Sequence, residues 1–159
     1  MILSLRAPGV VSANVTVGER VNMIILRNAL AVIFGLIAGG GVNMALIMAG
    51  SSMIPPPAGV DTSDAQSIAA SMHLFEPKHF VVPFLAHALG TLVGATTAFL
   101  IAASHNSALA YLIGAASLAG GVAASFMIPA PAWFIILDLV VAYIPMAWLG
   151  TLIGSRLKG

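Results

Sequence analysis

Residues 133–154 of this chain read WFIILDLVVAYIPMAWLGTLIG. The run contains no Lys or Arg, and its only acidic residue is Asp138. A helix rises about 1.5 Å per residue, so about 20 apolar residues cross the roughly 30 Å hydrocarbon core of a bilayer. The run therefore predicts a transmembrane helix that carries one carboxyl group inside the membrane. Pro145 predicts a kink in it, because proline removes one backbone hydrogen bond.

Three similar runs precede it, at 29–50, 80–103 and 108–128, and none of them contains Lys, Arg, Asp or Glu. The composition agrees, because the 159 residues are 60% hydrophobic and only 7% charged, whereas a soluble domain is about 25% charged. We predict an all-α membrane protein, in which residues 24–155 form a bundle of four transmembrane helices. The links after the second and third runs are short, so the last three helices are predicted to be antiparallel neighbours.

The charge and cysteine content exclude several classes of protein. Six Lys and Arg residues against five Asp and Glu residues give a formal net charge of +1, so we expect no nucleic-acid partner. The absence of cysteine excludes disulfides and thiolate metal sites. His87 is the only histidine within a predicted span, so a haem with two histidine ligands is excluded and we expect no cofactor.

The distribution of basic residues predicts the orientation. Cytoplasmic loops of membrane proteins are enriched in Lys and Arg. Lys78 alone lies on one predicted side, and the side that holds both termini carries Arg6, Arg20, Arg27, Arg156 and Lys158. We therefore expect a bacterial inner-membrane protein with both termini in the cytoplasm. Residues 156–159 form the cytoplasmic C-terminus, and residues 1–23 form either a cytoplasmic arm or sequence upstream of a start at Met23.

The loop at 51–79 is then predicted to lie outside the cell. The three prolines 55–57 favour a stiff, extended exit from the first helix. Ser63 and Gln66 have the spacing of a helix capping box, which predicts a short helix over about residues 64–74.

Three residues of this loop, His73, Glu76 and His79, are potential metal ligands spaced three apart. Pro77 interrupts any helix that would place both histidines on one face, and Lys78 disfavours a bound cation. We therefore predict no metal site, and we interpret these residues as a solvated polar collar.

Three polar side chains within the spans are predicted to lie at one depth. Counted at about 1.5 Å per residue, Asn43 and His87 lie about 10 Å, and Asp138 about 8 Å, below the outer ends of their helices. A mid-helix carboxylate costs roughly 2.5–3.5 kcal/mol on insertion scales, so Asp138 is expected to face a partner or water rather than lipid. Either the three residues join the helices by hydrogen bonds, or they bind a cation or a polar head group or relay protons.

Glycines recur in these helices at the small-xxx-small spacing that allows close helix contacts. We predict that they form packing faces: Gly35, Gly39, Gly90, Gly94, Gly120, Gly121, Gly150 and Gly154.

Two motifs resemble those of an uncharacterised family of small bacterial four-span integral membrane proteins. The resemblance extends over about residues 24–155 and implies the same fold without implying an activity. Members of that family often have histidine where this chain has Ala130. The motifs are Ile54-Pro55-Pro56-Pro57 with Gly59, Asp61 and Asp64, and Pro129-Ala130-Pro131-Ala132-Trp133-Phe134.

Two functional hypotheses follow. The chain has no cysteine, and none of its serines has an intramembrane base in reach. Nucleophilic catalysis is therefore not supported, and we expect no enzyme. The leading hypothesis is an accessory or scaffolding subunit in the lipid bilayer, which packs through its glycine faces as a homo-oligomer or against other membrane subunits. The alternative is a small transporter or channel that uses Asn43, His87 and Asp138.

Overall fold

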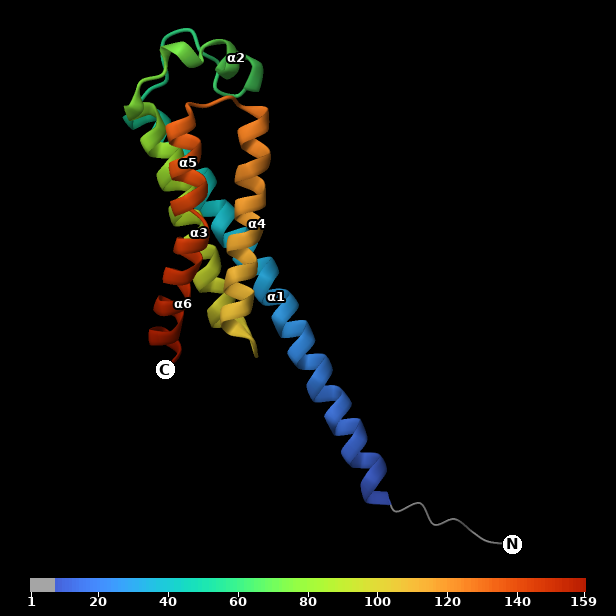
Figure 1. The fold of residues 1–159 in the computed structure, drawn as a ribbon. Coiled ribbons are helices and arrows are strands. Elements are labelled where there is room, and N and C mark those ends of the chain that lie inside the picture. The colour runs from blue at the N-terminus through green and yellow to red at the C-terminus, as the bar shows by residue number, and fades with distance from the viewer. Residues whose placement is uncertain (1–7) are drawn as a thin grey trace, which may run out of the picture.

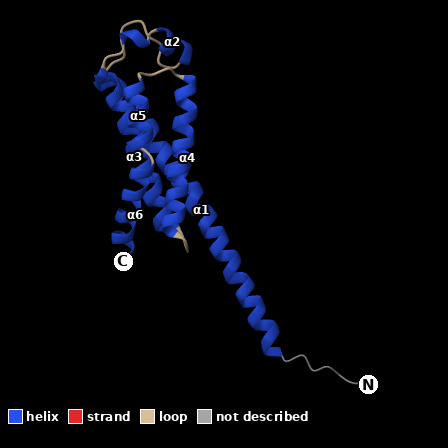
Figure 2. Cartoon of the chain, viewed as in Figure 1, coloured by secondary structure: helices blue, strands red, loops and turns tan. Residues whose placement is uncertain are grey.

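The computed structural model describes residues 8–159, and the described chain is helical and contains no strand. Four segments are long and apolar enough to cross a membrane: Thr16–Met53, Pro77–Ile101, Asn106–Met127 and Ala132–Lys158. The predicted all-α, multi-pass membrane fold is therefore confirmed. Figures 1 and 2 show its elements, which are α1 (Pro8–Met53), α2 (Ala65–Ala70), α3 (Val81–Ile101), α4 (Asn106–Met127), α5 (Ala132–Val141), α6 (Ile144–Lys158) and the short 3-10 helices η1 (Met72–Leu74) and η2 (Pro77–Phe80).

The long helices run alternately up and down. α1 and α4 run toward the end of the bundle where residues 54–80 lie, which we call the cap end, and α3 and α5–α6 run back from it (Figure 1). The first turns of α1 and the C-terminus lie at the opposite end, which we call the terminal end. Both ends of the described chain are thus on one side of the bundle, as an even number of spans requires.

α1 is much longer than the predicted span of 29–50. It is one continuous helix from Pro8 to Met53, and its first half projects beyond the other helices (Figure 1). Gly18 does not interrupt it, because a glycine within a helix costs only about 1 kcal/mol relative to alanine. Residues 1–7 of the predicted arm at 1–23, which include Arg6, lie outside the described residues. The remainder of the arm is part of α1.

The fourth span is broken rather than simply kinked. α5 ends at Val141 and α6 begins at Ile144, with Pro145 in its first turn. The loop between them is visible in Figure 2. Proline fits the first turn of a helix because the backbone donors there have no partner within the helix. The predicted kink at Pro145 therefore takes the form of a helix restart.

Glycines bring α1 and α3 into backbone contact. A Cβ added to Gly39 would lie 2.7 Å from the carbonyl oxygen of Gly90, and one added to Gly35 would lie 2.9 Å from that of Gly94. Cβ atoms essentially never come that close to another atom, so this contact requires glycine. The predicted close approach therefore occurs inside the chain, between two antiparallel glycine pairs.

The other predicted packing glycines differ from one another. Gly150 lies against Ala95 of α3, and Gly154 lies against the ring of Phe99. Gly121 contacts Tyr143. Gly120 has no atom of the described residues within 4 Å of the position of an added Cβ, so its predicted packing contact is not seen among residues 8–159.

Side chains from other helices cap the last turn of α3 at the terminal end. Arg27 Nε donates to the carbonyl oxygen of Ile101 at 2.6 Å, and Lys158 Nζ donates to that of Ala102 at 2.7 Å. Asn106 Nδ2 donates to the carbonyl oxygen of Phe99 at 2.7 Å. The last carbonyls of a helix have no partner within it and carry partial negative charge, so basic and amide donors stabilise this end.

The cap end is held by local polar contacts and aromatic rings. Asp64, rather than Ser63, caps α2, and its carboxylate accepts from the backbone N–H groups of Gln66 and Ser67. The side-chain and backbone donors of Ser63 lower the pKa of Asp61. Two rings of α5 pack against Phe80 of η2, whose centroid is 4.8 Å from that of Phe134 and 5.4 Å from that of Trp133.

We predict that Gly39→Ala destabilises the bundle, whereas Gly40→Ala does not. The methyl group at residue 39 would press on the backbone of α3, and overpacking typically costs about 1–3 kcal/mol. No atom lies within 4 Å of the Cβ position at Gly40, so there alanine contributes only its better helix propensity of up to about 1 kcal/mol. Thermal unfolding in detergent, followed by circular dichroism, measures both; equal midpoints would refute the backbone contact.

Candidate functional site

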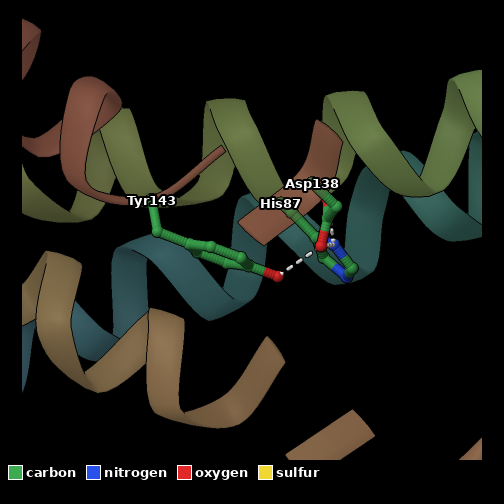
Figure 3. Close-up of polar contacts among 3 residues, drawn as sticks. All are labelled: His87, Asp138 and Tyr143. Carbon is green, nitrogen blue, oxygen red and sulfur yellow. Dashed lines mark hydrogen bonds and ion pairs between the residues drawn. The ribbon is translucent and has the colours of Figure 1, made fainter. Parts of the chain in front are cut away.

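The structure brings together two of the three polar residues predicted at one depth. Asp138 lies on α5 with its side chain only 6% exposed, and His87 faces it from α3 (Figure 3). His87 Nδ1 is 2.9 Å from one carboxyl oxygen of Asp138 and 3.0 Å from the other. The carboxyl group therefore points into the bundle, toward a hydrogen-bonding partner, and not toward lipid.

Tyr143 completes this cluster, and the sequence analysis did not identify it. Its hydroxyl donates to Asp138 Oδ2 at 2.8 Å. Its ring stacks on the imidazole of His87, with centroids 5.8 Å apart and planes at 30°. We call His87, Asp138 and Tyr143 the polar triad (Figure 3).

The helix break explains why Tyr143 reaches Asp138. In an uninterrupted helix, residues five apart are rotated by about 140° around the axis, so their side chains face different directions. Here α5 ends at Val141, and Tyr143 has φ −117° and ψ −79°. The changed backbone direction turns the phenol toward the preceding turn of its own span.

A glycine of α4 makes room for this phenol. A Cβ added to Gly121 would lie within 2.8 Å of three atoms of Tyr143, including the hydroxyl oxygen. Any side chain at residue 121 would therefore displace the hydroxyl from Asp138. Gly121 thus shapes the triad although it carries no functional group.

Asn43 does not join the triad. Within the described chain it makes no hydrogen bond, and it lies beside Gly90, where an added Cβ would be 3.2 Å from Asn43 Cβ. Gly90 is three residues further along α3 than His87, which corresponds to about 4.5 Å of helix. The predicted depth of Asn43 is therefore wrong by almost one helical turn. Counting residues along each helix does not include the register between α1 and α3, which their glycine contact sets.

Two cavities meet at the triad. The cap-side cavity, of about 370 Å³, lies beneath residues 54–80 of the cap end, between α1, α3, α4 and α5, and His87 and Asp138 line it at the end farthest from these residues. The mid-bundle cavity, of about 280 Å³, lies between α1, α3 and α4, and its lining includes Asn43, His87 and Tyr143. His87 therefore lines both cavities, and the triad lies between them.

The hydrogen-bond pattern links the positions of the hydrogens in the triad to its charge. A carboxylate only accepts hydrogen bonds, so an ionised Asp138 requires a hydrogen on His87 Nδ1. The triad then carries a charge of −1 when His87 Nε2 is unprotonated, and no net charge when Nε2 is protonated. Charge within a membrane is costly, so a carboxyl group at this depth marks a candidate site for a proton or another cation.

The remaining candidate groups have other partners. His79 Nδ1 accepts from the backbone N–H of Glu76 at 2.9 Å, and Glu76 pairs with Lys78 at 3.1 Å. Among residues 8–159, no group of three or more His, Asp and Glu side chains gathers as a metal site. Ser125, which lines the cap-side cavity, donates its hydroxyl to the carbonyl oxygen of Val122 at 2.7 Å.

No family model, curated protein or solved structure matches this chain. The resemblance of its two proline motifs to the bacterial four-span family therefore stays a prediction. The functional argument rests on the geometry of the triad and its cavities.

We predict that Tyr143→Phe destabilises the protein more than Tyr111→Phe does. The first substitution removes a buried donor to Asp138, and a hydrogen bond to a charged group contributes about 1.5–3 kcal/mol. Tyr111 is 38% exposed on α4, and the described structure gives it no hydrogen bond. Unfolding by denaturant in mixed micelles measures both free energies; a loss at Tyr143 no larger than that at Tyr111 would contradict the bond.

Proposed function

We propose that this protein is a small membrane transporter or channel in which Asp138 binds the transported proton or cation. One observation carries the proposal: a buried carboxyl group, held by His87 and Tyr143, lies where two cavities meet. Ionisable residues within membrane spans commonly mark ion pathways and proton relays. The protein is proposed to move its substrate without chemically changing it.

The packing of the glycines favours this function over a scaffold. Gly35, Gly39, Gly90 and Gly94 contact one another within the chain, and Gly150 and Gly154 contact α3. These faces are therefore occupied and are not surfaces for another subunit. The excess of glycine-rich faces, which suggested an accessory subunit, is explained by the internal packing of the bundle.

The proposed location is the bacterial inner membrane, with the terminal end in the cytoplasm. Arg27 and Lys158 lie at the terminal end, where they cap α3, whereas Lys78 lies at the cap end. This distribution supports the orientation through the enrichment of basic residues on the cytoplasmic side. The cap-side cavity then faces the exterior.

We predict that Asp138→Asn abolishes proton flux. Asparagine keeps the size of the side chain but cannot bind and release a proton at this site. The purified protein is reconstituted into vesicles that contain a pH-sensitive dye, and a proton gradient is imposed. Flux through the variant is expected to fall to that of protein-free vesicles.

Asp61→Asn is the matched control, because it makes the same chemical change at an exposed loop position. Its flux is expected to equal that of the wild type. Undiminished flux through Asp138→Asn would exclude the carboxyl group as the transport site.

A specific observation supports a second candidate, the accessory or scaffolding subunit. Asn43 makes no hydrogen bond within the described chain, and Gly40, Gly41 and Gly120 have no neighbour within 4 Å of an added Cβ. Amide side chains form hydrogen bonds between membrane helices, each contributing about 1–2 kcal/mol or less. Asn43, Gly40 and Gly120 line the mid-bundle cavity, so a second copy or another subunit would pack where this cavity lies between α1 and α4.

If this second function holds, Asn43→Leu shifts the assembly toward monomers. Native mass spectrometry of the protein released from mild detergent measures the distribution of oligomers. Asn22→Leu, on the exposed part of α1 outside the bundle, is the control. Only monomers in the wild type would refute self-association.

A further inference from the structure

We propose that the cap-side cavity binds an organic cation with an apolar body, and that this cation and a proton compete for Asp138. The inference rests on the proposed function, because it names the substrate class of the same site. It is carried by three features of the cavity, which are its walls, its charge and its aromatic rings.

The walls of the cavity are predominantly apolar. They come from four long helices and the outer loop, and they include Ile47, Ile54, Met72, Phe75, Ile128 and Leu139. A volume of about 370 Å³ lies at the lower end of the range of about 300–1,000 Å³ that is typical of small-molecule pockets. Such walls favour a hydrocarbon body and provide few donors for a sugar or another highly polar solute.

The charge of the cavity depends on Asp138. Asp138 is the only acid among its lining residues, and the lining contains no Lys or Arg. His79 also lines it, and its Nδ1 accepts a hydrogen bond from Glu76 N–H. When Asp138 is ionised and the histidines are neutral, the site carries one negative charge, which a monovalent cation would balance.

Aromatic rings lie between this charge and the cap end. Phe134 is four residues before Asp138 on α5, so the two side chains share one face of the helix and lie about 6 Å apart along its axis. The rings of Phe134 and Phe80 pack with centroids 4.8 Å apart, and both line the cavity. Ring faces attract ammonium groups, and the attraction is stronger when water is excluded.

An inorganic cation fits the site less well. Calcium takes six to eight oxygen ligands, and magnesium takes six. The two carboxyl oxygens of Asp138 already accept from His87 and Tyr143. An ammonium group enclosed by rings and balanced by one carboxylate does not require such a shell of oxygens.

Charge balance makes the cation compete with a proton. Without a ligand, one additional proton on the His87–Asp138 pair brings the triad to zero net charge. When a monovalent cation enters, that proton leaves, and neutral His87 continues to donate from Nδ1 to the carboxylate. The titratable groups that face Asp138 are His87 from α3 and Tyr143 after α5; the parts of α1 and α4 that line the two cavities contribute none.

Calorimetric titration of the purified protein in detergent tests this proposal, with benzyltrimethylammonium as the probe. Its net-uncharged analogue, N,N-dimethylbenzylamine N-oxide, controls for the shape of the apolar body. The wild type is expected to bind the cation at least tenfold more tightly than the analogue. As the pH rises, the Kd of the wild type for the cation should fall by up to tenfold per pH unit. Titration in two buffers should show that up to one proton is released for each cation bound.

Asp138→Asn is expected to weaken cation binding at least tenfold, and Asp61→Asn is expected to leave it unchanged. Phe134→Leu should weaken it several-fold, and Phe126→Leu, at an exposed position on α4, should not. Equal affinity for cation and analogue, or a Kd independent of pH in the wild type, would overturn the proposal. The wild-type measurements decide this outcome even if a variant does not fold.

The same preparations separate this inference from the proposed function. Asp138-dependent proton flux without cation binding would refute the organic cation and leave transport standing. Cation binding that depends on Asp138, in vesicles that show no proton flux with or without the cation, would refute transport and leave the binding site standing.

Discussion

A carboxyl group within hydrocarbon requires hydrogen-bond donors from its own protein, because neither lipid nor bulk water supplies them. In this chain the donors for Asp138 come from His87 on α3 and from Tyr143 after the end of α5. Asp138 has these donors because α3 lies beside α5, because the fourth span is broken before Tyr143, and because Gly121 leaves room for the phenol. An otherwise apolar bundle is thereby given one defined polar centre.

The second constraint is the backbone contact between α1 and α3. The pairs Gly35–Gly94 and Gly39–Gly90 allow these two helices to approach more closely than any side chain would permit. α4 has no comparable contact with α1, and the space between them forms part of both cavities. The arrangement that packs one half of the bundle tightly therefore also leaves room beside the polar triad.

The sequence predicted what depends on composition and on position along a single helix. Hydropathy and length predict four spans, and the depth count places His87 and Asp138 at one level. Asn43 was misplaced because its neighbours depend on the register between α1 and α3, which residue counting does not contain. Tyr143 was missed because a continuous helix would direct it away from Asp138, and the caps on α3 were missed because Arg27 and Lys158 reach it from other helices.

The break in the fourth span links fold to chemistry. A restart of the helix leaves backbone groups without helical partners, which is costly in a membrane unless neighbouring groups satisfy them. Here Pro145 lies in the first turn of α6, where no backbone donor is needed for a bond within the helix. The restart also places Tyr143 so that it gives Asp138 a second hydrogen-bond donor, which a straight helix would not provide. Because Tyr143 also stacks on His87, a ligand that displaces either side chain from Asp138 would act directly on the junction of α5 and α6. The triad therefore ties the junction of α5 and α6 to α3.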